Sequence, residues 1–226
     1  MSENRAAEMT VLMFHGVGVP GHALEDGEAD YWVSEARFAE MANHVAANHA
    51  RRVELTFDDG NASDLAAARV LHGLGLSAAF FVLVGRIGKP GYLSVADIGE
   101  LRSLGMEVGL HGRDHVDLRR ADDATMRSEI DLAREELADI CHAPVTSMAI
   151  PYGLYDRRVW NYLARTDFRR IHTSDRGTAK PGDRFVRRNP IMAWHGADHI
   201  AELMRRRPPL AARARMAVMP RLKRLI

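Results

Sequence analysis

Residues 53–61 have the sequence VELTFDDGN, an apolar and β-branched run that ends in two adjacent carboxylates and a glycine. The run predicts a strand, and the acidic segment with its glycine predicts the turn that follows. Taken alone, this turn has a structural explanation, in which an aspartate or asparagine caps the next helix. The functional interpretation, a strand that delivers paired acids to its carboxyl end, becomes the stronger one beside residues 111–115, HGRDH.

The bulk composition is that of a soluble globular protein. The 226 residues are 46% hydrophobic and 27% charged, and their number suits one α/β domain of barrel size. The single cysteine, Cys141, excludes an intramolecular disulfide and fits a reducing compartment. The first apolar run, residues 11–14, is too short for a signal peptide, and no run approaches the roughly 18 apolar residues of a spanning helix. We therefore expect a cytoplasmic protein.

The net charge of +1 conceals an asymmetry. Residues 205–226 hold eight arginines or lysines and no acid, so that residues 1–204 keep 23 basic against 30 acidic residues, a net charge of −7. We interpret the tail as a solvated chain end, with weak contact to an anionic membrane surface as the alternative and no nucleic-acid partner. The predicted domains are a barrel over residues 1–204 and a basic tail over residues 205–226.

The chain alternates between predicted strands and predicted helices. The seven strands are Met9–His15, Arg52–Phe57, Ala78–Val84, Met106–Leu110, Thr146–Ile150, Phe168–His172 and Phe185–Arg188. The six helices are Glu35–His49, Asn61–Leu74, Val95–Leu104, Asp122–Cys141, Asp156–Arg165 and His199–Arg207, and residues 17–33 form a long loop. This order predicts a single-domain α/β fold, a distorted (β/α) barrel with about seven parallel strands, with an open doubly wound sheet as the alternative.

Several polar residues directly follow predicted strands. They are His15, Asp58 with Asp59, His111 with His115, and Tyr152. In a parallel barrel all strand carboxyl ends open onto one rim, where active sites are found. The barrel prediction therefore brings these residues together from separate parts of the chain.

The spacing within the second motif suggests a metal site. His111 and His115 are four residues apart, so that one helical turn would place both imidazoles on the same face. Asp59 would add an oxygen and leave a position open for water, which is the ligand count of catalytic zinc; iron, cobalt, nickel or manganese are alternatives. A second pair with this spacing, His195 and His199, is better explained as the first turn of a helix.

Three motifs in this order resemble those of the polysaccharide deacetylase family of carbohydrate esterases. They are TFDDG at residues 56–60, HxxxH at residues 111–115 and PYG at residues 151–153. The resemblance covers most of residues 9–190. It implies a distorted (β/α) barrel that removes N-acetyl groups from sugars with the help of a divalent metal ion.

The resemblance also implies roles for individual residues. Metal binding falls to Asp59, His111 and His115, and the general base is Asp58. The chemistry agrees, because a metal ion can lower the pKa of its bound water from 15.7 to roughly 7, and a carboxylate that is not a ligand can accept the proton. A backbone N–H near Tyr152, next to Pro151, would donate to the developing oxyanion.

The sequence departs from the family pattern at the third motif. The family usually places there an arginine that pairs with the catalytic base, whereas this chain has Ala149. Either Arg113, Arg187 or Arg188 approaches the base from elsewhere, or Asp58 is held less well.

The general acid is also placed differently from the common pattern. The usual late Leu-x-His motif is not clear, and His195 is a poor candidate for it. Residues 14–17, FHGV, resemble the opening of a rearranged subgroup in which the acid histidine follows the first strand. We therefore expect His15 to be the acid and place His195 second; the structural alternative for His15 is a buried histidine at a strand end.

Three hypotheses follow for the function. The first is a metal-dependent hydrolase that removes N-acetyl groups from an N-acetylated sugar of a polysaccharide or glycan precursor, including lipid-linked or nucleotide-linked forms. The second is hydrolysis of a non-sugar amide on the same scaffold. The third, which Ala149 favours, is a catalytically inactive barrel that binds glycan or a partner enzyme.

Overall fold

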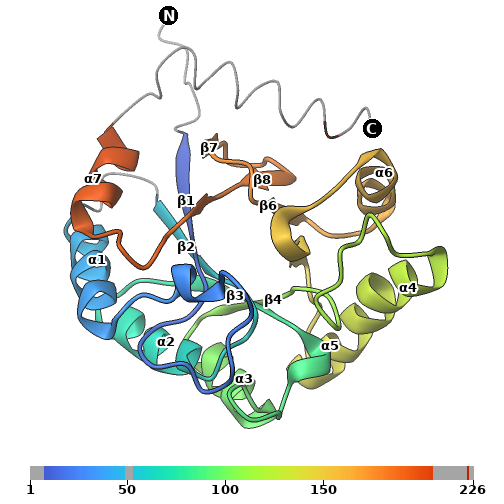
Figure 1. Cartoon of the computed structure of the whole chain (residues 1–226), viewed down its shortest axis with the longest axis horizontal. Helices are drawn as coiled ribbons and strands as arrows, with labels where there is room; N and C mark the ends of the chain where they lie inside the picture. Colours follow the sequence, from blue (N-terminus) through green and yellow to red (C-terminus); the bar gives the residue numbers. More distant parts are fainter. Residues whose placement is uncertain (1–7, 49–52, 206–222, 224–226) are drawn as a thin grey trace, which may run out of the picture.

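One sheet of mostly parallel strands curves into a nearly closed barrel, with helices around its outside (Figure 1). The computed structural model describes residues 8–48, 53–205 and 223. Seven parallel neighbours follow one another in the sheet: β1 (Met9–Phe14), β2 (Val53–Phe57), β3 (Ala78–Val82), β4 (Glu107–Leu110), β5 (Ser147–Ala149), β6 (Arg170–Thr173) and β8 (Phe185–Arg187). All seven predicted strands are present, which confirms the barrel prediction.

Two strands of two residues each were not predicted. β7 (Thr178–Ala179) pairs antiparallel with β1, and β9 (Asn189–Pro190) pairs parallel with β1. β9 follows β8 almost immediately, yet β8 pairs with β6 on the opposite side. The segment 185–190 therefore joins the last parallel strand to the first, and this closure is incompatible with the open sheet considered as the alternative.

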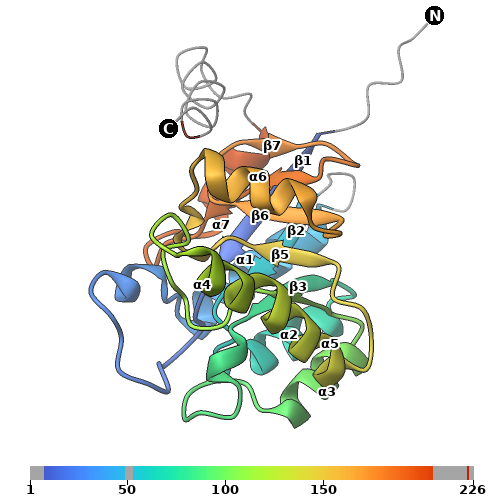
Figure 2. The same cartoon turned by 90° about the vertical axis from the view of Figure 1, so that its right-hand side faces the viewer.

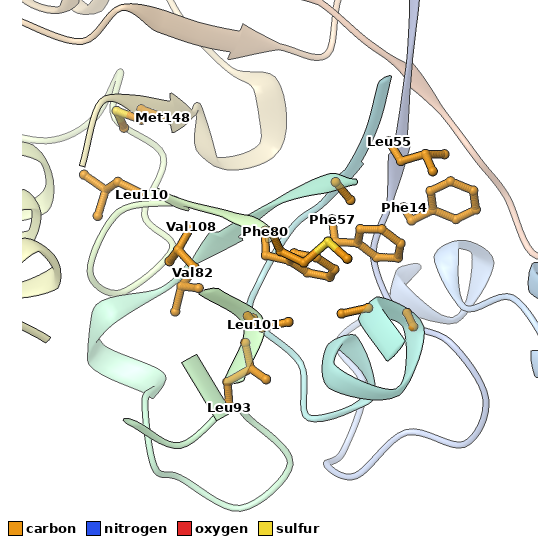
Figure 3. Close-up of a cluster of buried hydrophobic side chains, with 14 of the residues drawn as sticks. Phe14, Leu55, Phe57, Phe80, Val82, Leu93, Leu101, Val108, Leu110 and Met148 are labelled. Carbon is orange, nitrogen blue, oxygen red and sulfur yellow. The ribbon is translucent and has the colours of Figure 1, made fainter. Parts of the chain in front are cut away.

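Residue alternation sorts the strand side chains into an outer and an inner set. Phe14, Phe57 and Phe80 are neighbours in register on β1, β2 and β3, and their rings stack with centroids 5.2 and 4.6 Å apart (Figure 3). This aromatic ladder packs against Phe38 of the first helix, whose ring lies edge-on to Phe14. Because successive strand residues point to opposite faces, Asp58 points away from this outer core.

The outer layer contains the predicted helices. They are α1 (Glu35–Ala47), α2 (Ser63–Gly73), α3 (Val95–Ser103), α4 (Asp123–Arg127), α5 (Ala133–Cys141), α6 (Arg157–Arg165) and α7 (Ala197–Arg205). Ser34 and Ser94 cap α1 and α3, since each side chain accepts a backbone N–H three residues on. The predicted helix Asp122–Cys141 is divided by a π-helical turn, Ser128–Leu132, between α4 and α5.

The long loop after β1 is less irregular than expected. A short 3₁₀ turn, Glu28–Tyr31, lies within it, and in Figure 2 this blue segment projects from the body of the barrel.

No helix within the described ranges is long and apolar enough to cross a membrane. Three ends of predicted elements, His49, Arg52 and Arg207, lie outside the described residues, and so does nearly all of the basic tail.

Candidate functional site

The two adjacent acids after β2 point in different directions. Asp58 still follows the strand, since its N–H donates to the carbonyl of Phe14 at 3.0 Å, and its side chain is buried. Asp59 has a left-handed backbone with φ 79°, and Gly60 follows with φ 70°. Few residues other than glycine adopt this conformation readily. The turn directs the carboxylate of Asp59 towards the two histidines that follow β4.

Asp59, His111 and His115 form a compact group that could hold a metal ion. One ligand atom from each residue lies within 4.8 Å of the others. Asp59 Oδ1 is 3.4 Å from His111 Nε2 and 3.6 Å from His115 Nε2. The loop after β4 is not helical, so the two imidazoles converge through loop geometry and not through the helical turn that the spacing suggested.

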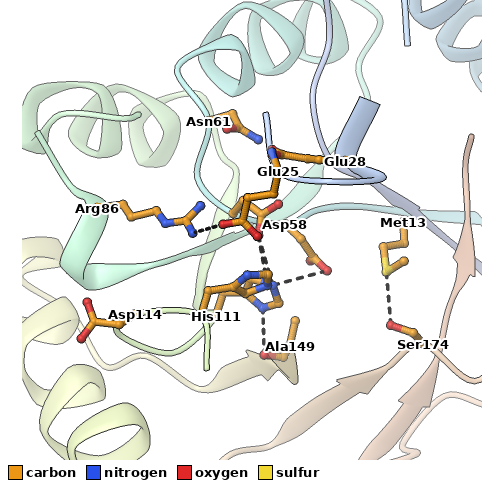
Figure 4. A network of polar contacts seen from close by, with 12 residues as sticks. Met13, Glu25, Glu28, Asp58, Asn61, Arg86, His111, Asp114, Ala149 and Ser174 are labelled. Atoms are coloured by element: carbon orange, nitrogen blue, oxygen red, sulfur yellow. Dashed lines mark hydrogen bonds and ion pairs between the residues drawn. The ribbon is translucent and has the colours of Figure 1, made fainter. Parts of the chain in front are cut away.

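The tautomer of His111 suits metal binding. Its Nδ1 is 3.0 Å from the carbonyl oxygen of Ala149, which can only accept, so Nδ1 carries the proton (Figure 4). In the neutral imidazole, which is the form that binds metal, the lone pair of Nε2 then faces Asp59. Ala149, which stands where the family usually has an arginine, thus contributes its backbone oxygen to the site.

The charges of the group also fit a divalent cation. Burial and the nearby His111 lower the pKa of His115 to about 4, which keeps this imidazole neutral at pH 7. Burial alone would lower the pKa of His111, but the carboxylates of Asp58 and Asp59 outweigh it and raise the pKa. Asp59 Oδ1 is buried without a hydrogen-bond donor among the described residues. A cation between the three side chains would satisfy this oxygen.

Arg188 binds the other acid of the adjacent pair, Asp58. Its guanidinium donates to both oxygens of Asp58, at 2.6 and 2.8 Å, and its side chain is fully buried. Arg188 also contacts Thr56 Oγ1 and the carbonyl of Thr173, each at 3.3 Å. Burial alone would raise the pKa of Asp58, but the guanidinium outweighs it and keeps the pKa below its usual value. Asp58 is therefore ionised and fixed in orientation at neutral pH.

Of the three arginines considered from the sequence, the structure brings Arg188 to Asp58. Arg113 instead pairs with Glu136 at 2.6 Å on the outside of the barrel. Arg188 lies between β8 and β9, in the segment that closes the barrel, and its side chain points inward.

A third carboxyl group lies behind this pair. Asp64 on α2 is fully buried, and neither of its oxygens has a hydrogen-bond partner among the described residues. Burial, with the charges of Asp59 and Asp58, raises the pKa of Asp64 well above its usual value. Burial thus favours the uncharged form of this third carboxyl group, and sequence patterns gave no sign of it because Asp64 occupies an ordinary helical position.

A cleft of about 400 Å³ gives access to the group. His15, Asp59, His115 and Tyr152 line it together. Tyr152 has a left-handed backbone with φ 55°, is 51% exposed, and its ring lies 4.0 Å from the ring of His115. Pro151 precedes it in a buried position. Residues from the ends of four parallel strands therefore do lie around one opening.

His15 and His195 have different surroundings. The ring of His15 lies 4.6 Å from that of Tyr31 inside the cleft. His195 is not among the residues that line the cleft; its Nδ1 accepts the N–H of Met192 at 3.0 Å, and its ring stacks on His199 at 3.6 Å. Burial, then the neighbouring His199, lower the pKa of His195 to about 4.

The loop after β1 forms an acidic wall that sequence reasoning did not assign to the site. Four of its acids line the cleft: Glu25, Asp26, Glu28 and Asp30. Glu25 pairs with Arg86 at 3.3 Å (Figure 4). His22 anchors the loop, because its Nε2 is 2.9 Å from Asn61 Oδ1 and its ring stacks on Tyr92. The acidic run EDGEAD at residues 25–30 is the signal that could have identified the wall.

The fold and the site together define a (β/α) barrel with a candidate metal centre at the carboxyl ends of its strands. Residues 46–171 match the family model of polysaccharide deacetylase. The chain therefore belongs to the polysaccharide deacetylase family, a family of hydrolytic deacetylases, which confirms the resemblance of the motifs.

A relative agrees with this assignment, and solved structures share the fold. A chitooligosaccharide deacetylase of Bradyrhizobium is 31% identical over 157 residues, which cover 66% of this chain and 69% of the relative. The structure of a polysaccharide deacetylase from Bacillus cereus matches with a TM-score of 0.77 at 23% identity, and the match covers 88% of this chain and 69% of the Bacillus chain. The structure of a deacetylase from Streptococcus pyogenes in complex with acetate matches with a TM-score of 0.77 at 19% identity, and the match covers 89% of this chain and 100% of the Streptococcus chain. The two structural matches establish the fold.

Replacing Arg188 by methionine should destabilise the protein strongly, because Asp58 would remain as a buried charge without a partner. The expected loss in the free energy of unfolding is about 3–5 kcal/mol, measured by urea denaturation. Arg187→Met, at the neighbouring and partly exposed arginine, is the control and should change stability little. The double variant Asp58→Asn/Arg188→Met should recover part of the loss. An unchanged urea midpoint for Arg188→Met would contradict this account of the pair.

Proposed function

We propose that the protein is a metal-dependent hydrolase that removes N-acetyl groups from N-acetylated sugars of a polysaccharide or oligosaccharide. The observation that carries the proposal is a buried, arginine-bound carboxylate next to a compact Asp-His-His group in one accessible cleft. Membership of the polysaccharide deacetylase family supports the reaction class, and the similarity to a chitooligosaccharide deacetylase supports an N-acetylated sugar as substrate.

Asp59, His111 and His115 would hold one divalent metal ion. Zinc is our first choice for this set of two imidazoles and one carboxylate; iron, cobalt, nickel and manganese are alternatives. When bound, the ion supplies a water of lowered pKa and polarises the acetamide carbonyl. The protein contributes the orientation of the ligands, above all through the hydrogen bond from His111 to the carbonyl of Ala149.

Asp58 would act as the general base. Its Oδ2 lies 3.9 Å from His111 Nε2, so it borders the metal group without belonging to it. Arg188 keeps it ionised and occupies one lone-pair site on each oxygen. A carboxylate has about four such sites, so Asp58 can still accept the proton of the attacking water.

Tyr152 would stabilise the oxyanion that develops on the reacting carbonyl. Its left-handed backbone places it on the cleft wall, beside His115. In the proposal its backbone N–H donates to the oxyanion, while buried Pro151 fixes the start of the turn.

His15 would donate the proton that the departing amine needs, because it lines the cleft with Asp59 and His115 whereas His195 does not. His15→Gln should therefore slow deacetylation by about 10²- to 10⁴-fold, the usual contribution of a general acid. His195→Gln is the matched control, and its rate should stay close to that of the wild type. Acetate release under saturating substrate measures both. A full rate in His15→Gln with a loss in His195→Gln would reverse the assignment.

The acidic wall bears on the charge of the substrate. Four carboxylates of the loop line the cleft, and Arg86, which also lines it, already pairs with Glu25. Such a surface repels phosphate-bearing compounds and tolerates neutral or cationic chains. Within the proposal, this favours an uncharged glycan chain over a nucleotide-linked sugar.

The alternative of a catalytically inactive barrel has lost its main support. That interpretation depended on the missing arginine at Ala149, and Arg188 supplies the equivalent pair with Asp58 from another part of the chain. Among the described residues that line the cleft, none specifically favours a non-sugar amide.

A substrate panel tests the proposed function. We expect acetate release from an N-acetylated chitooligosaccharide, no release from simple acetamides, and slower release from UDP-N-acetylglucosamine. The penalty on the nucleotide sugar should shrink at high ionic strength, because salt screens the acidic wall. Release from small amides alone would overturn the sugar specificity, and a salt-independent preference would overturn the role of the wall.

Two neighbouring variants separate metal binding from base catalysis. Asp59→Ala should lose both the metal and the activity, because it removes a ligand. Asp58→Asn should keep the metal and lose activity by about 10²- to 10⁴-fold. Elemental analysis of purified protein gives the metal content. Wild-type protein that is active without metal, or Asp59→Ala that keeps both metal and activity, would refute the ligand assignment.

A further inference from the structure

Glu129 is a buried acid that the proposed mechanism does not use. It lies in the π-helical turn Ser128–Leu132, and only 2% of its surface is exposed. Turns of this kind are rare, and they often occur at functional sites because the wider helix displaces one residue from the regular register. The hydrogen-bond donors of its carboxylate belong to the loop that carries both histidines of the candidate metal site.

The carboxylate of Glu129 binds the backbone between these histidines. Oε2 accepts the N–H of Arg113 at 2.8 Å, and both oxygens accept the N–H of Asp114 at 3.2 Å. The guanidinium of Arg113 does not take part, because it pairs with Glu136. Glu129 therefore fixes the path of the main chain and not a side chain.

The loop needs such a support. Gly112 has φ 94° and His115 has φ 58°, so both ends of the loop lie in the left-handed region. For a histidine this conformation is uncommon and unfavourable. On the opposite side, the carbonyls of Gly112 and Arg113 accept the N–H groups of Val84 and Gly85 at 3.1 and 2.9 Å. The peptide groups between the histidines are thus held from two sides.

Packing at Gly112 shows how close the carboxylate lies. A Cβ added at this position would be 2.8 Å from Glu129 Oε2 and 3.4 Å from Pro151 Cγ. The first distance is shorter than van der Waals contact, so a larger residue would displace the carboxylate or the loop. Gly112 and Glu129 are therefore mutually adapted.

We propose that Glu129 is a positioning residue that sets the separation of the His111 and His115 imidazoles and thereby the metal affinity of the site. It reaches the metal group only through the backbone of residues 113 and 114. This inference rests on the proposed metal site, and the proposed function does not depend on it.

The affinity for Zn²⁺ tests the inference. In Glu129→Gln one carboxylate oxygen becomes an amide N–H₂, which cannot accept a backbone N–H. Competition with a chromophoric chelator should show a dissociation constant about 10- to 100-fold higher than in the wild type, the usual effect of losing a group that orients metal ligands. Glu136→Gln is the matched control, since Glu136 contacts the side chain of the same Arg113, and its affinity should be unchanged.

A measurement on the metal-free protein separates positioning from general stability. The amides of Arg113 and Asp114 should exchange their hydrogens faster in Glu129→Gln than in the wild type or in Glu136→Gln. Thermal unfolding in parallel reports whether the variant is folded. Should Glu129→Gln not fold, Glu129→Asp keeps the charge but withdraws the carboxylate by one methylene group from both N–H donors, and it should weaken Zn²⁺ binding likewise.

The outcomes are distinct. Wild-type protein that binds no Zn²⁺ or other divalent ion refutes the metal-dependent function itself. Wild-type affinity in folded Glu129→Gln, or in Glu129→Asp where that variant replaces it, overturns the positioning role and leaves the proposed function intact.

Discussion

The ion pair between Asp58 and Arg188 connects the closure of the barrel to the chemistry at its mouth. Arg188 lies where the chain passes from β8, which pairs with β6, to β9, which pairs with β1. Its guanidinium can reach Asp58 only if this segment closes the sheet. A buried pair of this kind contributes little net stability, but losing one partner is costly. The pair instead contributes specificity, because it fixes the ionisation and the direction of Asp58 while the adjacent Asp59 turns towards the histidines.

The fold could be predicted from the sequence because strand-like runs alternate with helical segments along the chain, and one of these runs, β3, is apolar throughout, as strands buried on both faces require. The alternation of strands and helices also predicted that the candidate site residues lie at strand ends, where a parallel barrel brings them together. β7 and β9 could not be predicted, since two residues carry no periodicity and their pairing depends on β1. The choice among Arg113, Arg187 and Arg188 also depended on structure, because a shift of one residue in a strand reverses the face that a side chain occupies.

The parts of the site that sequence reasoning missed are supplied by segments without a regular pattern. The acidic wall comes from a loop whose anchor, His22, contacts Asn61 across 39 positions of the chain. Glu129 looks like an ordinary polar residue on a long amphipathic helix, and only the π-helical turn reveals that it faces inward. Both act on the geometry of the cleft from outside the three motifs. Under the proposed function, the motifs therefore supply the reacting groups, whereas these two segments determine access to them and their mutual position.

The late position of Arg188 has a consequence for biosynthesis. Asp58 and its partner are 130 positions apart, and chains are made from the amino terminus at about 5–20 residues per second. Every side chain of the candidate metal group therefore leaves the ribosome several seconds before the arginine. Under the proposed function, a growing polypeptide therefore contains its metal ligands before it contains an oriented base, because Asp58 has no guanidinium partner until translation has passed the closing segment.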